Sequence, residues 1–200
     1  MKHAPARSRK FRNAARRASA HTGPHLPGGF FLTDPDRLYS ARTIAAGLPE
    51  GIGVIIRHFG QAEAIGEARA IVADARRAGR IVLIAADPAL AKETGADGVH
   101  WPFRLQRQML KQRHEGGLHT MSVHSAHEVR AATRCRPHAL IYSAVFPSSS
   151  PSAGAAKGLM RFAAIARQTQ CPVYALGGIT HINAERAAQF GGFASVSGFR

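Results

Sequence analysis

Eight short apolar runs alternate with segments of helical period along this 200-residue chain, and this alternation constrains the fold more than any other feature. Most of the runs are apolar on both faces and rich in Val and Ile, which is typical of parallel strands that are buried on both sides. The predicted strands lie at residues 30–34, 53–59, 80–86, 97–102, 118–124, 139–146, 172–178 and 193–199.

The segments between these runs have the pattern of amphipathic helices. In residues 61–79 the apolar side chains recur at helical spacing, as on one face of a helix. The other predicted helices lie at residues 35–47, 87–94, 103–113, 125–134, 158–168 and 180–190. Eight strands that alternate with helices predict a (β/α)8 TIM barrel of the α/β class.

A doubly wound open sheet is the alternative fold. Such sheets usually have five or six strands and a Gly-rich first turn, whereas residues 32–38 are not Gly-rich. We therefore predict a barrel domain at residues 28–200 and a separate basic extension at residues 1–27. The 45% hydrophobic content is enough for one core, and no apolar run approaches the roughly 18 residues that span a bilayer.

The eighth predicted strand ends near Arg200, so we expect a barrel that lacks its last helix. Two explanations for the uncovered strands remain open. Residues 9–20 have a helix-compatible composition and could fill the empty position, or a partner subunit of a homo-oligomer could cover it. If residues 9–20 form this helix, its inward face would consist of Phe11, Ala14, Ala15 and Ala18.

The formal charge of +15 is distributed unevenly. Residues 1–27 hold seven Lys or Arg and no acid, which leaves 20 basic and 12 acidic side chains, or +8, on residues 28–200. We predict that residues 1–27 are a flexible, solvated extension. Two alternatives remain open for this extension: contact with nucleic acid or an anionic membrane, and an organellar transit function. A secretory signal is not expected, because no long apolar stretch is present. The net charge of +8 on residues 28–200 favours an anionic ligand, most simply phosphate.

The two cysteines indicate a reducing compartment. Cys135 and Cys171 are far apart and fit no metal-binding or redox spacing, so we expect both to be reduced core residues. We therefore predict a cytoplasmic protein. No two histidines have a helical metal-ligand spacing inside one element, so a zinc site is not expected.

The stretch "YALGGITHINA" ends an apolar run at Gly177 and Gly178, directly before a predicted helix. Two glycines let the backbone approach an anion closely, and a following helix offers unpaired N–H groups and a positive dipole end. Ser197 and Gly198 end the eighth run and could donate to the same phosphate, because the loops after strands 7 and 8 of a barrel commonly bind one. A tight turn without a ligand is the alternative.

Six segments in this order and spacing resemble the thiamine phosphate synthase/TenI family. The resemblance spans residues 29–200 and implies a (β/α)8 fold that binds a thiazole phosphate or thiamine phosphate. Synthases of the family join a hydroxymethylpyrimidine diphosphate to a thiazole phosphate with Mg²⁺ and release pyrophosphate, whereas TenI-type members tautomerise an aminothiazole-carboxylate phosphate without a metal. The segments are "FFLTD", "GADGVHWP", "SVHSAHEV", "AVFPSSSPSAG", "PVYALGGI" and "SVSGF".

The resemblance implies diphosphate-binding positions that this chain keeps only in part. In the family pattern Gln-x-Arg-x-Lys, Arg57 is kept, while Ile55 and Phe59 replace the Gln and the Lys. In the pattern Thr-x-Thr-Lys, residues 148–150 keep hydroxyls and Pro151 replaces the Lys. His100 is kept at its position. The residues expected to face substrate or diphosphate are therefore Arg57, His100, Ser148, Ser149 and Ser150.

The metal-binding pattern that the resemblance implies is also incomplete. Asp87 keeps one carboxylate, its preceding Asn is Ala86, and Leu105 stands where the second metal-binding Asp would be. Arg104 lies beside that position, and a cation there argues against a metal. Two expectations remain open: Mg²⁺ held by Asp87 together with substrate phosphates, or no metal.

His124, with Ser122 nearby, ends the fifth run. The resemblance implies that this His is the proton shuttle of TenI-type members, which suits an imidazole because it titrates near neutral pH. A lone His at a strand end is otherwise more often structural. We interpret His127 as a surface residue. The loop 147–154 is rich in Ser, Pro and Gly and is either a plain linker or a lid that closes over a diphosphate.

The resemblance leads us to expect a thiamine phosphate synthase-like protein of thiamine biosynthesis that binds small phosphorylated thiazole and pyrimidine substrates. Two alternatives remain open: a metal-independent TenI-type tautomerase, and a non-catalytic barrel that binds thiamine phosphate or contacts nucleic acid through its basic extension.

Overall fold

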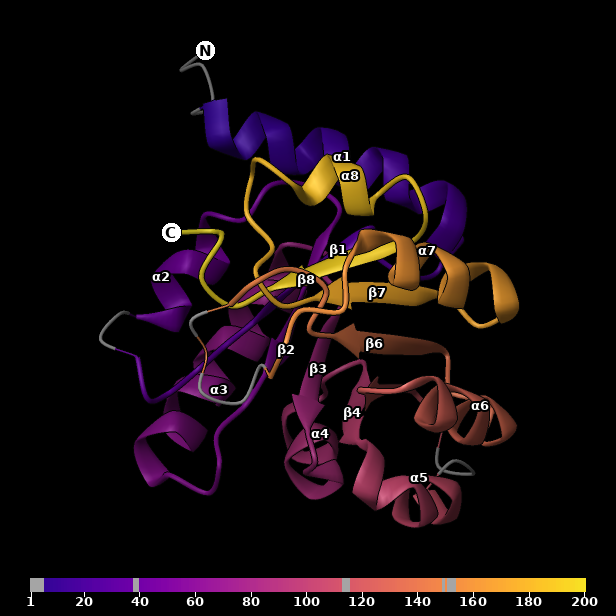
Figure 1. Ribbon diagram of the computed structural model, residues 1–200. Helices are drawn as coiled ribbons and strands as arrows, with labels where there is room; N and C mark the ends of the chain where they lie inside the picture. The colour runs from indigo at the N-terminus through magenta and orange to yellow at the C-terminus, as the bar shows by residue number, and fades with distance from the viewer. Residues whose placement is uncertain (1–5, 38–39, 113–115, 149, 151–153) are drawn as a thin grey trace.

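The computed structural model describes residues 6–37, 40–112, 116–148, 150 and 154–200, and within them the sheet is a closed barrel of eight parallel strands (Figure 1). Each strand pairs with the next, and the first pairs with the last, in the register Gly29↔Phe193. The predicted barrel is confirmed, and the open-sheet alternative is wrong. The strands are β1 (Gly29–Leu32), β2 (Ile52–Ile56), β3 (Val82–Ala85), β4 (Gly98–Pro102), β5 (Leu118–Val123), β6 (Ala139–Ser143), β7 (Val173–Leu176) and β8 (Gly192–Ser195).

Every segment predicted to be helical contains a helix, although two of the helices are short. Residues 35–47 and 180–190 were predicted as whole helices but form helices of only 6 and 4 residues, respectively. In the second case Asn183 Oδ1 accepts the Thr180 N–H at 2.8 Å, which stabilises a turn in place of the first helical turn. The helices are α2 (Ala41–Ala46), α3 (Ala62–Arg77), α4 (Pro88–Thr94), η1 (Phe103–Leu105), α5 (Gln106–Gln112), α6 (Ala126–Arg134), α7 (Leu159–Gln168) and α8 (Ala184–Ala187).

Residues 6–22 form an additional helix, α1 (Ala6–Thr22), which lies along α8 and against β8 (Figure 1). The Phe11 ring stacks on Phe193 at 5.9 Å between centroids and contacts Phe199 at 4.3 Å. A side chain on Gly28 would overlap the Ala15 carbonyl oxygen, so the two backbones approach closely. The buried face of α1 consists of Phe11, Ala14, Ala15, Ala18 and Thr22.

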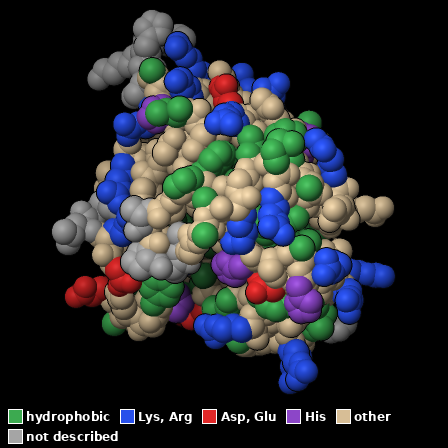
Figure 2. All heavy atoms as spheres, in the orientation of Figure 1, with side chains coloured by type: hydrophobic (Ala, Val, Ile, Leu, Met, Phe, Trp, Pro, Cys, Tyr) green, Lys and Arg blue, Asp and Glu red, His purple; other side chains and the backbone are tan. Residues whose placement is uncertain are grey.

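The prediction of a flexible extension is therefore wrong for residues 6–22. Small alanine side chains let α1 pack tightly on the barrel, and one large ring supplies most of the apolar contact. The alternative, a helix in the position left empty after β8, is confirmed. The exposed face of α1 carries basic side chains, among them Arg7, Arg9, Lys10, Arg16 and Arg17, and Figure 2 shows Lys and Arg over much of the visible surface.

Apolar side chains fill the barrel interior, which restricts a ligand site to the ends of the strands. Phe30, Ile55, Leu83 and Tyr174 belong to one interior cluster of fully buried residues. A second cluster lies between the sheet and the surrounding helices. Among the described residues, no helix is both long and apolar enough to cross a bilayer.

Candidate functional site

A cavity of about 540 Å³ opens at the carboxyl ends of the strands, where barrel enzymes carry their reactive groups. It lies over the filled interior and is lined by residues from most of the loops at that end of the barrel. The structure brings together here nearly all of the residues predicted from the sequence to form the site. Those lining the cavity are Arg57, His100, Ser122, His124, Ser148, Ser150, Gly177, Gly178, Ser197 and Gly198.

Two predicted site residues are not among them. Ser149 lies outside the described residues, as do residues 151–153, so the lid interpretation of the loop 147–154 stays a prediction. Asp87 is described but does not line the cavity.

The turn after β7 presents the backbone N–H groups of two residues that have no side chains. Gly177 and Gly178 have φ angles of 95° and 64°, a region that side chains other than glycine rarely adopt. A Cβ on Gly177 would lie 2.7 Å from the Ala144 Cβ, and one on Gly178 would overlap the Pro147 carbonyl oxygen. Within the described part of the chain, the N–H groups of Gly177, Gly178 and Ser197 donate to no protein acceptor.

Two of the contributions predicted for a phosphate site differ in the structure. The Gly198 N–H donates to Ser195 Oγ at 3.0 Å, so Gly198 shapes the turn and does not offer a donor. The expected helix dipole is also weak, because α8 has four residues and begins only at Ala184. An anion here would therefore be held by amides of the β7 and β8 loops, not by a helix N-terminus.

His124 lines the same cavity and is held in a defined orientation. Its Nδ1 lies 3.0 Å from Ser143 Oγ, and its backbone N–H donates to Glu128 Oε2 at 2.7 Å. Lys157 Nζ donates to the Ser143 carbonyl oxygen at 2.7 Å and so fixes the end of β6. Among the described groups, no partner is bonded to His124 Nε2, which leaves this nitrogen for a ligand.

His100 is buried and fully hydrogen-bonded. Its Nδ1 lies 2.8 Å from Thr120 Oγ1 and its Nε2 lies 2.7 Å from Ser122 Oγ. Burial, with a smaller contribution from the charge of Arg57, lowers the pKa of His100 to about 3. The ring is therefore neutral near pH 7 and orients Ser122, instead of exchanging protons with a substrate.

The Asp87 carboxylate is engaged in local structure. Its Oδ1 accepts the Leu90 N–H at 2.9 Å as the N-cap of α4, and its Oδ2 lies 3.4 Å from His58 Nε2. No carboxylate is among the described residues that line the cavity, and no group of three metal-ligating side chains occurs in the described part of the chain. Mg²⁺ requires several oxygen ligands, so an ion at Asp87 would depend on substrate phosphates for most of them.

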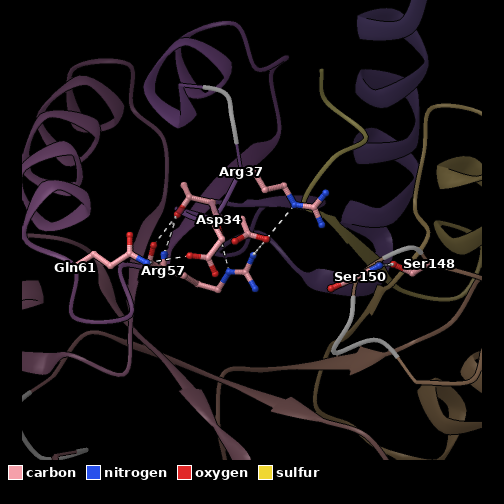
Figure 3. A network of polar contacts seen from close by, with 8 residues as sticks. Asp34, Arg37, Arg57, Gln61, Ser148 and Ser150 are labelled. Carbon is pink, nitrogen blue, oxygen red and sulfur yellow. Dashed lines mark hydrogen bonds and ion pairs between the residues drawn. The ribbon is translucent and has the colours of Figure 1, made fainter.

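Arg37 and Ser143 are among the residues of the cavity wall that sequence reasoning missed. Arg37 Nε donates to Asp34 Oδ2 at 3.0 Å, and Arg57 Nη2 lies 3.3 Å from the same oxygen (Figure 3). The sequence did hold a signal for Arg37, since it follows the first strand closely and loops that follow barrel strands meet at one end of the barrel. Ser143 ends β6, where its hydroxyl reaches His124.

Comparison with known proteins agrees with this fold and gives a family match. Residues 31–199 match the family model TMP-TENI, described as thiamine monophosphate synthase. None of the curated proteins compared matches the chain.

Several solved structures share the fold. The thiamine phosphate pyrophosphorylase from Pyrococcus furiosus has 20% identity and a TM-score of 0.67, over 84% of this chain and 85% of that one. The thiamine phosphate pyrophosphorylase from Bacteroides thetaiotaomicron has 19% identity and a TM-score of 0.55, over 84% and 81%. The orotidine 5'-phosphate decarboxylase from Pyrococcus horikoshii has 16% identity and a TM-score of 0.55, over 83% and 88%.

These structural likenesses show the barrel fold alone, whereas the family model covers most of the chain. The resemblance predicted from the six sequence segments is thus confirmed, and the chain belongs to the TMP-TENI family, the family of thiamine monophosphate synthase.

Proposed function

We propose that the protein binds a phosphorylated thiazole of thiamine biosynthesis and catalyses a metal-independent proton shift on the thiazole. One observation carries this proposal. The same cavity presents backbone N–H groups without protein acceptors, an oriented His124 with an available Nε2, and no carboxylate among its described lining residues.

The phosphate binds to the N–H groups of Gly177, Gly178 and Ser197. Each amide offers a donor, and a phosphoryl group accepts several hydrogen bonds at once. The positive φ angles of Gly177 and Gly178, together with their lack of side chains, let a ligand approach these two N–H groups closely. The cavity volume of about 540 Å³ lies within the usual range for small-molecule sites, so the thiazole ring fits above the filled barrel.

His124 exchanges the proton. When Nδ1–H donates to Ser143 Oγ, the lone pair is on Nε2, which can take a proton from a carbon of the bound ring. The carbon–hydrogen bond breaks, the double bonds of the conjugated system shift, and the same proton is returned to another carbon. Atoms and electrons balance within the substrate, so the step needs neither a metal nor a leaving group.

Coupling of the thiazole phosphate to hydroxymethylpyrimidine diphosphate is the second candidate. Membership of the synthase family favours it, as does the presence of Arg57, Ser148 and Ser150 in the cavity. In that reaction the bond from carbon to the diphosphate oxygen breaks and a bond to the thiazole nitrogen forms. The departing pyrophosphate develops charge that Mg²⁺ and lysines ordinarily neutralise, and this chain lacks the family's second metal carboxylate and both lysines.

Mg²⁺ dependence separates the two reactions. Purified protein should convert one ring tautomer of a phosphorylated thiazole carboxylate into the other at the same rate in EDTA and in excess Mg²⁺, as followed by proton NMR. With both thiamine precursors it should form no thiamine phosphate under either condition. Mg²⁺-dependent formation of thiamine phosphate would instead establish the coupling reaction and contradict our proposal.

A further inference from the structure

The outward face of α1 carries positive charge that the rest of the protein does not cancel. Six of the 17 residues of this helix are Lys or Arg, and none is Asp or Glu. Among the described residues its one ion pair joins Arg16 Nη2 to Glu50 Oε2 at 3.9 Å, between side chains that are 70% and 82% exposed. So long and exposed a pair contributes little, and the charge of α1 stays open to a partner.

The surroundings of α1 do not neutralise it either. On α8, which lies along α1, the exposed Glu185 is followed by the exposed Arg186, so these two charges balance. Residues 28–200 carry a further net charge of +8. Figure 2 shows Lys and Arg side chains at the edge of the molecule where α1 runs in Figure 1. Such a field attracts polyanions.

Packing on the barrel holds the cations of α1 in a fixed array. The opposite face of the helix is buried against the barrel, with Phe11 only 1% exposed. Arg9 and Lys10 are exposed, and the same arrangement recurs seven residues later at Arg16 and Arg17. Seven residues span two helical turns, so the two cation pairs are separated by about 10 Å along the helix axis.

This array does not suit insertion into a membrane or stacking on single strands. Helices that lie on a membrane bury an apolar face in it, whereas the apolar face of α1 is already covered by the barrel. Proteins that bind single-stranded nucleic acid commonly stack bases on aromatic side chains. Among the described residues, the exposed large apolar side chains all lie outside α1, at Phe59, Leu110, Met160 and Ile182.

We propose that α1 binds double-stranded DNA through its phosphate backbone, an interaction that goes beyond the proposed function and does not rest on it. The separation of the two cation pairs is close to the roughly 12 Å width of the B-DNA major groove, so each pair can contact phosphates of a different strand. The major groove of duplex RNA is narrow and does not match this separation. Contacts to phosphates read no bases, so the binding is independent of sequence.

DNA bound to α1 leaves the cavity open to its own ligand. The helix packs along α8 and against β8, and none of its described residues lines the cavity at the strand ends. Saturating DNA should therefore leave the affinity for thiazole phosphate unchanged. A DNA site that fails does not affect the proposed function, and a thiazole phosphate that fails to bind does not affect the DNA site.

The test measures binding of a fluorescent DNA duplex of about 20 base pairs by anisotropy at several KCl concentrations. Each cation that contacts a phosphate adds about 0.9 to the slope of log affinity against log salt. Loss of four such cations should weaken binding at least tenfold near 100 mM KCl and make the slope shallower by about 3. The variant combines Arg9→Gln, Lys10→Gln, Arg16→Gln and Arg17→Gln. Because Gln suits helices and Phe11 is kept, α1 should remain folded.

The matched control removes four exposed cations from the other side of the barrel. These cations lie on α5 and α6, which follow β4 and β5, and β4 is opposite β8 in the ring of strands. The control should bind DNA within about twofold of the native chain and with the native slope, because α1 is intact. It combines Arg107→Gln, Lys111→Gln, Arg130→Gln and Arg134→Gln.

Several results would overturn the inference. They are no binding of the duplex by the native chain at about 50 mM KCl, and equal losses in the two fourfold variants. Tighter binding of phosphatidylserine vesicles, of single-stranded DNA or of duplex RNA than of duplex DNA would also overturn it. If the melting temperature shows that the α1 variant is unfolded, Arg9→Gln with Arg16→Gln decides instead. This pair should lose about half of the slope change, and an unchanged slope would overturn the inference.

Discussion

Replacement of Phe11 with alanine should lower the free energy of unfolding by about 3–5 kcal/mol, the usual range for loss of a large buried ring. The Phe11 ring is 1% exposed and contacts Phe193 and Phe199, which belong to β8 and the chain end. The remaining buried residues of α1 are three alanines and Thr22, so this ring supplies most of the apolar contact of the helix. Its loss would leave a cavity beside Phe193 and Phe199 that the alanines of α1 are too small to fill.

Urea denaturation measures this effect, and Phe59→Ala is the control. Phe59 is the same residue type but is 60% exposed, so its loss should change stability by no more than about 0.5 kcal/mol. Deletion of residues 1–27 should lower the melting temperature further than Phe11→Ala. An unchanged melting temperature in the deletion would show that α1 is not part of the barrel's stable structure.

Replacement of His124 with alanine should reduce turnover of the thiazole tautomer about 100-fold or more, as is usual for loss of a positioned acid/base group. Binding of the thiazole phosphate should be retained, because the Gly177 and Gly178 amides do not depend on the imidazole. Steady-state kinetics by proton NMR gives the turnover, and titration gives the affinity. His100 cannot replace His124 in this role, because its pKa of about 3 makes it a weak base and its two nitrogens are already hydrogen-bonded.

His127→Ala is the matched control for that experiment. His127 is exposed on α6, three residues after His124, and is not among the residues that line the cavity. It should retain native turnover. Equal turnover in His124→Ala and the native protein would remove His124 from the mechanism, even if the barrel and the phosphate site were correct.

The barrel was predictable because buried strands and amphipathic helices differ in the spacing of their apolar residues. Both spacings are clear in this sequence. The run at 53–59 became β2, and the helical pattern at 61–79 became α3. Because barrel loops after strands meet at one end, the placement of Gly177 and His124 in one cavity followed from the fold. The resemblance to the family added Arg57 and His100.

The remaining features depend on contacts that periodicity does not encode. The basic composition of residues 1–27 indicated a solvated extension, yet burial of a single phenylalanine and three alanines fixes α1 on the barrel. Periodicity did not indicate that the Asp87 carboxylate caps α4, and its role as a metal ligand stays a prediction. Arg37 was missed because its role depends on a shared carboxylate, Asp34, that pairs it with a residue of another strand end.

The central claim is that loop amides after β7 and β8 bind the phosphate of the ligand. A crystal structure with thiazole phosphate bound tests it most directly. We predict phosphate oxygens about 2.7–3.2 Å from the backbone nitrogens of Gly177, Gly178 and Ser197, with the ring beside His124. A phosphate bound at Arg37 and Arg57 with those three amides empty, or bound outside this cavity, would contradict the account.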